Sequence, residues 1–199
     1  MKMEEKTMKK LLAILLVLAT MFSLVACGEK EEGNSGNEGN DTPVVETPAG
    51  ETFNVGAFNV YVPGGWKAFP VADLFAEEAD AVDPTVIEIC KGGEVHTDIY
   101  SKPYVRLSYY DPDTIMGRDK SFYEDVKDLD PVVAGNFTWE AFSCTSFGYA
   151  MTILWMADGD HEYQAHEYQA IVYTDQEDGS ISVTDADVLE ILASVQPTG

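Results

Sequence analysis

Residues 58–66 read Phe58-Asn59-Val60-Tyr61-Val62-Pro63-Gly64-Gly65-Trp66 and predict a strand that ends in a tight turn. The first five residues alternate with a period of two, which is typical of a strand with one buried face. Pro63-Gly64-Gly65 favours a turn, because proline fixes φ and glycine adopts positive φ without strain. Trp66 then begins a second strand, so the folded part of the chain opens with β-structure.

Strand patterns continue through most of the remaining chain. Alternation is clearest over residues 104–110, where Val105, Leu107 and Tyr109 face one way and the residues between them face the other. We expect further strands over residues 85–90, 136–146, 149–157 and 163–174, separated by turns at Gly148 and Asp158-Gly159. Consecutive strands with short connections indicate an antiparallel sheet.

Three segments favour helices. Ser121-Phe122-Tyr123-Glu124 has the pattern of a capping box, with Phe122, Val126 and Leu129 on one face and Pro131 ending the segment. Thr184 can cap a second helix, whose apolar stripe is Val188, Ile191, Leu192 and Val195. A third helical pattern covers residues 71–79. The sequence therefore predicts a single α+β domain over residues 52–199.

Apolar residues recur in a definite order at both ends of this domain. The two stretches are Phe58-x-Val60-x-Val62-Pro63-x-Gly65-Trp66 and Asp187-Val188-x-x-Ile191-Leu192-x-Ser194-Val195. They resemble the PsbP-like fold family over about residues 52–196. The resemblance implies a curved antiparallel β-sheet flanked by two or three helices. Members of that family share a scaffold for protein docking and no common catalytic set, so the resemblance carries no function.

The first 27 residues have the organisation of a secretory signal. A basic start precedes an apolar run over residues 11–26, which ends in Leu24-Val25-Ala26-Cys27. This ending resembles the lipobox of bacterial lipoproteins. The resemblance implies a signal peptide over residues 1–26, cleavage between Ala26 and Cys27, and a diacylglyceryl group on the thiol of Cys27. We therefore expect a lipid-anchored protein on the extracytoplasmic face of the cell membrane.

A transmembrane anchor is the alternative to a cleaved signal. A spanning helix needs about 20 predominantly apolar residues. The run over residues 11–26 is shorter, contains Thr20 and Ser23, and leads into acidic residues rather than a positive flank. An uncleaved anchor would leave Cys27 unmodified. Met8 is a second candidate start, because Met8-Lys9-Lys10 supplies a basic region by itself.

The mature chain is strongly acidic. Without the four lysines and two glutamates of residues 1–26, it has 8 basic and 33 acidic side chains, a net charge of −25. Such a surface repels nucleic acid and anionic lipid headgroups, so no nucleic-acid partner is expected. Residues 27–51 are rich in Gly, Asn, Glu and Pro and have little apolar content. We expect a disordered tether between the lipid and the domain.

A tandem repeat, His161-Glu162-Tyr163-Gln164-Ala165 and His166-Glu167-Tyr168-Gln169-Ala170, is the most unusual local feature. A shift of five along a strand sends the second copy to the opposite face, so Tyr163 and Tyr168 would point apart. We interpret the repeat as a duplication taken up by a bulge or a longer hairpin. A zinc metalloprotease motif needs two histidines four residues apart on a helix, and these are five apart in a strand-like run.

Other motifs of site chemistry are absent from the sequence. No glycine-rich phosphate loop and no cysteine pair with zinc spacing occurs, and we predict no catalytic, cofactor-binding or metal-binding residue and no cofactor. The acidic turns Asp158-Gly159-Asp160 and Asp175 to Asp178 lack the ligand order of a calcium loop. Ser101, Ser108 and His96 match no nucleophile motif. Cys90 and Cys144 are expected to be two buried thiols, with a disulfide as the alternative.

The candidate binding surface is a group of tyrosines near the Asp111-Pro112-Asp113 turn. Its members are Tyr100, Tyr104, Tyr109, Tyr110 and Tyr123. Tyr104 and Tyr110 are the two that we predict to contact a partner, because tyrosine offers a large apolar face and a polar tip. The competing interpretation is that they only pack the sheet.

These observations favour a non-catalytic binding or scaffolding lipoprotein of the cell envelope. Its partners would be the membrane lipid, through Cys27, and an unidentified envelope protein, peptide or glycan. A small envelope hydrolase, with a site assembled only in the fold, is the first alternative. A solute-binding lipoprotein is the second, although a domain of this length lacks the two lobes usual in that class.

Overall fold

The structure is a computed structural model that describes residues 49–111, 119–158 and 166–198. Strands make up 57% of these residues, and they include one α-helix. The predicted α+β class with two or three flanking helices is therefore wrong, because the described chain is mostly β. Its main element is a seven-stranded sheet in which every neighbouring pair is antiparallel.

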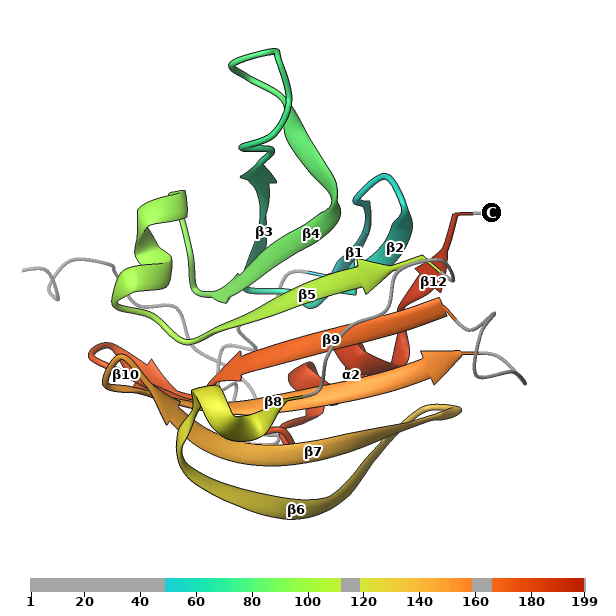
Figure 1. The fold of residues 1–199 in the computed structure, drawn as a ribbon. Helices are drawn as coiled ribbons and strands as arrows, with labels where there is room; N and C mark the ends of the chain where they lie inside the picture. Colours follow the sequence, from blue (N-terminus) through green and yellow to red (C-terminus); the bar gives the residue numbers. More distant parts are fainter. Residues whose placement is uncertain (1–48, 112–118, 159–165, 199) are drawn as a thin grey trace, which may run out of the picture. The chain divides into compact units, whose positions relative to one another are not determined.

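The seven strands lie in an order that differs from their order in the chain (Figure 1). From one edge to the other they are β3 (Trp66–Ala72), β4 (Val82–Lys91), β5 (Tyr104–Tyr110), β9 (His166–Tyr173), β8 (Tyr149–Asp158), β7 (Phe137–Ser146) and β6 (Glu124–Ala134). Three strands, β9, β8 and β7, therefore separate β5 from β6 in the sheet, although β6 follows β5 among the strands described along the chain.

One face of the large sheet, here called the core face, is covered by a small sheet and a helix. The small sheet consists of β1 (Glu51–Asn54), β2 (Phe58–Val62) and β12 (Gln196–Pro197), and the helix is α2 (Ala186–Ala193). Val105 and Leu107 of β5 are fully buried there, in one cluster with Phe58 and Val60. In Figure 1, α2 lies behind β8 and β9. This layer is the main hydrophobic core.

Polar contacts fix α2 against the strands that begin the domain. Its apolar stripe is buried as predicted, because Val188, Ile191 and Leu192 are inaccessible to solvent. Trp66 donates from its indole Nε1 to Asp187 Oδ2 over 3.0 Å. Ser194 accepts from the backbone N of Tyr61 at 2.8 Å. The two terminal motifs therefore meet in the structure as packing partners.

The helix predicted over Ser121 to Leu129 is wrong. Lys120–Phe122 form one 3-10 turn (η3), which Asp119 caps by accepting from the backbone N of Ser121, and β6 then begins at Glu124. The capping-box pattern marks a real turn, but pairing with β7 makes the next segment a strand. Pro131 is tolerated within β6 because this is an edge strand, where a missing N–H leaves no sheet partner unpaired.

The helix predicted over residues 71–79 is also wrong, and the cap of the C-terminal helix is displaced by one residue. Residues 73–81 form the turn of the β3–β4 hairpin, with the backbone N of Phe75 bonded to Asp73 Oδ1. Leu74 and Phe75 are 87% and 99% exposed, so no buried stripe exists to stabilise a helix. Asp185, not Thr184, is the N-cap residue of α2.

Several sequence predictions lie outside the described residues. These are the signal peptide, the lipidation site at Cys27, the tether up to residue 48, the Pro112-Asp113 part of the acidic turn and the first copy of the repeat. The second copy lies in β9, where Tyr168 is buried on the core face. Among the described residues, no helix has the length and apolar character needed to cross a membrane.

Candidate binding site

The face of the large sheet opposite α2 carries the candidate site, and we call it the open face. In β5 the side chains of Tyr104, Arg106, Ser108 and Tyr110 belong to it, because the alternate residues Val105 and Leu107 are in the main core. Antiparallel pairing places Tyr173 beside Tyr104 and Ile171 beside Arg106. The next strand, β8, continues this row with Met151 and Ile153.

Two short 3-10 segments lie against the open face. One is η2 (His96–Tyr100), in which buried Ile99 packs with Tyr104, Phe69 and Cys90. The other is η3 together with Tyr123, whose ring centroid is 5.7 Å from that of Phe142 in β7. In Figure 1 this second segment is the short yellow turn in front of β8. The sheet between the two segments is left uncovered.

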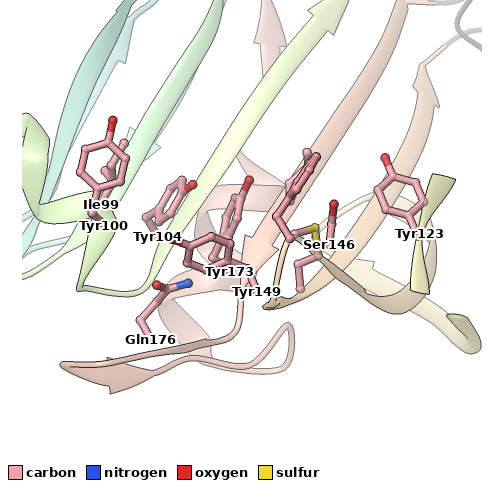
Figure 2. A pocket seen from close by; sticks show the side chains of 11 residues that line it. Ile99, Tyr100, Tyr104, Tyr123, Ser146, Tyr149, Tyr173 and Gln176 are labelled. Carbon is pink, nitrogen blue, oxygen red and sulfur yellow. The ribbon is translucent and has the colours of Figure 1, made fainter. Parts of the chain in front are cut away.

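The uncovered region is a pocket of about 320 Å³. We call it the tyrosine pocket, and its lining is Ile99, Tyr100, Tyr104, Tyr123, Ser146, Phe147, Tyr149, Met151, Ile171, Tyr173 and Gln176. Figure 2 shows the rings of Tyr104 and Tyr173 standing side by side between Tyr100 and Tyr123, with Gln176 below them. This lining contains no carboxylate, no histidine and no lysine or arginine.

The floor of the pocket is held rigidly by stacked rings. Tyr104 and Tyr173 lie 4.1 Å apart, centroid to centroid, with only 12° between their planes, and Tyr149 meets Tyr173 edge-on at 6.4 Å. Tyr104 is 8% exposed. Burial, and then a hydrogen bond to Tyr173, raise the pKa of Tyr104 far above its ordinary value, so its hydroxyl stays protonated.

The rim of the pocket presents aromatic side chains to solvent. Tyr100 is 72% exposed and Phe147 is 97% exposed. Phe147 and Gly148 form the two-residue turn between β7 and β8, with φ values of 50° and 83°. Two positive φ values are the mark of a type I′ turn, for which Asn-Gly is preferred. Phe147 is strained in this position and has almost no burial to stabilise it, which makes it a candidate functional residue.

Gln176 supplies an unpaired hydrogen-bond donor to the pocket. It belongs to β10 (Asp175–Gln176), which pairs with β11 (Gly179–Ser180) in a small hairpin. Its amide Nε2 is buried and has no hydrogen-bond partner among the described residues. A buried amide without a partner is costly, so the position is suited to a ligand that brings an acceptor.

A charged cluster lies on the same face, next to the pocket. Glu88 of β4 is 5% exposed and accepts from Arg106 Nη1 at 2.8 Å and from His96 Nε2 at 2.6 Å. The His96 ring stacks on Phe69 with centroids 5.4 Å apart. The histidine is thus engaged by Glu88, and Ser108 is hydrogen-bonded to Tyr110, so neither forms a serine–histidine pair in the described chain.

The structure brings together only part of the predicted tyrosine surface. Tyr104, Tyr100 and Tyr123 line the pocket. Tyr110 lies further along β5 and stacks on Trp155 with centroids 6.0 Å apart. Tyr109 is on the core face, against Phe58 and Tyr168, as the alternation along the strand requires.

The sequence reasoning missed the half of the pocket that comes from distant strands. Tyr149 begins β8 and Tyr173 ends β9. The antiparallel register places Tyr173 beside Tyr104, and Tyr149 contacts the Tyr173 ring. Gln176 and Phe147 were also missed. Phe147 could have been found, because a phenylalanine directly before the glycine of a predicted hairpin turn is an unfavourable choice.

Cys90 and Cys144 are free and buried, which confirms the prediction of two buried thiols over a disulfide. Cys90 is in β4 and Cys144 is in β7, with β5, β9 and β8 between them. At about 4.8 Å per strand, this separation is roughly 19 Å, far beyond the reach of a disulfide. Among the described residues, no group of three or more histidine, cysteine or acidic side chains is placed to hold a metal ion.

Comparisons with known proteins give no family. No family model and no curated protein matches this chain. A solved structure from Bacteroides thetaiotaomicron, of a protein without a described function, is similar over 77% of this chain at 14% identity and a TM-score of 0.39. The match spans about half (49%) of that protein's chain. A likeness this low carries no argument about fold or function.

Proposed function

We propose that this chain is a non-catalytic binding lipoprotein, anchored through acylated Cys27 to the extracytoplasmic face of the cell membrane. Its tyrosine pocket would hold an uncharged group of another envelope component. The observation that carries the proposal is the pocket itself, whose lining combines strained and solvent-exposed Phe147 with the stacked rings of Tyr104 and Tyr173. Aromatic residues with a few polar groups are the usual lining of small-ligand sites.

The composition of the pocket favours binding over hydrolysis. A hydrolase needs a nucleophile beside a base, or a carboxylate pair, inside the cleft that holds the substrate. The lining residues supply tyrosine hydroxyls, Ser146 and an amide, but no histidine, carboxylate or lysine to act as the base. The charged cluster around Glu88 is already paired internally.

The anchoring part of the proposal rests on the lipobox pattern and is tested at the N-terminus. Mass spectrometry of the protein from its native membranes should find Cys27 as the first residue, carrying acyl chains. Replacement of Cys27 with alanine should release the protein from the membrane, since two acyl chains are what stable anchoring requires. A native product that retains residues 1–26 would refute the lipoprotein assignment.

The binding part is tested by crosslinking in the native cells. A photoreactive benzoylphenylalanine at position 149 keeps an aromatic ring in the lining of the pocket, and the same group at position 75 is the control. Phe75 is 99% exposed on the β3–β4 turn, and it is not among the residues that line the pocket. We expect adducts from position 149 that are absent from position 75. Equal or absent labelling at the two positions would contradict a binding role for the pocket.

A further inference from the structure

The tyrosine pocket contains three features that together restrict its ligand. The first is charge. No acidic or basic side chain of the described residues lines the pocket, and the whole chain has a net charge of −23. An anionic ligand group would lose its hydration without gaining a counter-ion and would be repelled by the acidic surface. A cation would be attracted by the tyrosine faces, but an ammonium group has no lone pair to accept from the unpartnered Gln176 Nε2. The Gln176 donor therefore favours a neutral ligand group.

The second feature is the combination of flat aromatic faces with hydroxyl groups. Tyr100, Tyr104, Tyr123, Tyr149 and Tyr173 all contribute rings (Figure 2). The π-face of an aromatic ring is electron-rich and attracts the polarised C–H groups of a saturated ring. Each phenol both donates and accepts hydrogen bonds, and Gln176 adds a buried donor without a partner. The ligand must therefore combine an apolar ring face with hydroxyl-like groups at its edge.

The third feature is the extent of the aromatic surface. The pocket volume of about 320 Å³ is near the lower end for small-ligand sites, so it has room for only one or two rings. Tyr100 and Phe147 are mostly exposed and continue the aromatic surface beyond it. A ligand that uses both must extend out of the pocket across its rim, as a chain of rings does.

From these features we infer that the tyrosine pocket binds a neutral oligosaccharide, with one pyranose ring against Tyr149 above the stacked Tyr104 and Tyr173 rings and the next on the rim. The inference rests on the proposed binding function and names the class of its ligand. In this arrangement Tyr149 stacks on the sugar, Gln176 Nε2 donates to a ring or hydroxyl oxygen, and Phe147 contacts the neighbouring unit.

A proline-rich peptide is the competing ligand, because such peptides also bind grooves lined with aromatic residues. Proline residues, however, offer only carbonyl acceptors, since they have no N–H. The tyrosine hydroxyls of the pocket also have lone pairs that accept hydrogen bonds, and sugar hydroxyls can donate to them. A peptide that binds as an added strand needs a sheet edge, whereas this pocket lies on a sheet face between η2 and η3.

The test is calorimetric titration of the full-length lipidated protein in phosphatidylcholine nanodiscs. The neutral probes are maltohexaose, cellohexaose, xylohexaose and hexa-N-acetylchitohexaose, with hexagalacturonate as the anionic control and acetyl-hexaproline amide as the peptide probe. We expect at least one neutral hexasaccharide to bind with a millimolar or lower Kd, and the anionic control not to bind.

Variants connect the binding to the pocket. Tyr149→Ala should weaken the affinity for the sugar at least about tenfold, because a stacking face is lost. Gln176→Leu should weaken it about tenfold, which is the effect of one lost hydrogen bond. Phe75→Ala is the matched control for an exposed aromatic side chain outside the pocket, and it should leave the affinity unchanged. Thermal unfolding of each variant verifies that the fold is retained.

Three outcomes would overturn the inference. These are binding of hexaproline alone, sugar binding that survives both pocket variants, and no binding of any neutral hexasaccharide. The crosslinking experiment separates these from failure of the proposed function. Protease-sensitive adducts at position 149 would support the proposed binding function but contradict a sugar ligand. Absence of adducts, together with no binding of any probe, would contradict both the proposed function and the sugar ligand.

Discussion

The rings of Tyr104 and Tyr173 stack almost parallel, 4.1 Å apart, although 69 positions separate them in the chain. They are direct partners in the β5–β9 ladder, where cross-strand pairs are the unit of sheet stabilisation. The same two rings form the floor of the tyrosine pocket. One interaction therefore joins the central strands and shapes the candidate site.

Tyr104 should be important mainly for stability. Tyr104→Ala removes a ring that is 8% exposed and should lower the free energy of unfolding by about 3 kcal/mol, as for other buried aromatic residues. Tyr104→Phe keeps the stack and loses only the hydroxyl, so the free energy of unfolding should fall by only about 1 kcal/mol. Urea denaturation followed by tryptophan fluorescence measures both. A fully folded and equally stable Tyr104→Ala protein would show that the stack is not structural.

Phe147 should behave in the opposite way, as a residue that costs stability. Phe147→Asn creates Asn-Gly at the β7–β8 turn and relieves the left-handed strain at φ 50°, so the free energy of unfolding should rise by about 0.5–1 kcal/mol. Thermal and urea unfolding check this. Phe75→Asn, at a fully exposed position with no such turn, is the matched control and should change stability by less than about 0.5 kcal/mol. Destabilisation by Phe147→Asn would mean that the ring packs against the protein.

The sequence predicted the strands better than their arrangement. Residues 104–110 and 149–157 alternate clearly, and both are strands in the structure. Residues 121–129 have helical spacing too, but long-range pairing with β7 outweighs this local preference, which periodicity cannot reveal. Long-range pairing also determines which residues line the pocket, and the sequence pattern does not reveal it. Tyr104 was predicted from its own segment, whereas Tyr149, Tyr173 and Gln176 join it only through the strand order.

The two domain cysteines should resist thiol reagents until the protein unfolds. Burial, and next the carboxylate of Asp98, raise the pKa of Cys90 to about 11, and burial also raises the pKa of Cys144. The thiolate is the reactive form, so it is scarce at about pH 8. Titration of the lipidated protein with Ellman's reagent should therefore give slow reaction when native and two rapid equivalents in denaturant. Rapid native labelling would contradict the burial, and no labelling after denaturation would indicate a disulfide.

Arg106 should be needed to neutralise Glu88. Arg106→Met removes a 2.8 Å charged hydrogen bond and leaves a carboxylate that is 5% exposed with only His96 beside it. Removal of one partner of a buried charge is strongly destabilising. Because Arg106 itself is partly exposed, water reduces the effect, and we expect the free energy of unfolding to fall by about 2 kcal/mol. Lys127→Met, at an exposed position of β6, is the control and should change stability by less than about 0.5 kcal/mol. Equal effects of the two substitutions, measured by urea denaturation, would contradict a structural role for the cluster.

Asp98 should make the η2 side of the pocket sensitive to acid. Its Oδ2 accepts from the backbone N of Glu94 at 2.7 Å and of Val95 at 3.3 Å, and from Lys102 Nζ at 3.2 Å. The backbone N–H groups, and then Lys102, hold the pKa of Asp98 below its ordinary value. A carboxyl whose pKa is lower in the folded state stabilises that state fully above the unfolded value of about 3.9, and this stabilisation is lost as the pH falls through the folded value.

Asp98→Asn tests this linkage, because the amide oxygen still accepts while the charge is absent. Above about pH 5 the wild-type protein should be the more stable of the two, and the difference should shrink as the pH falls below about 4. NMR signals of Ile99 and Tyr100, which η2 carries to the pocket, should shift over the same acid range in the wild type but not in the variant. Because η2 is held by the charged form of Asp98, ligand affinity at the pocket should decline with it. A stability difference that stays constant from about pH 6 to about pH 3 would show that the charge of Asp98 does not hold this segment.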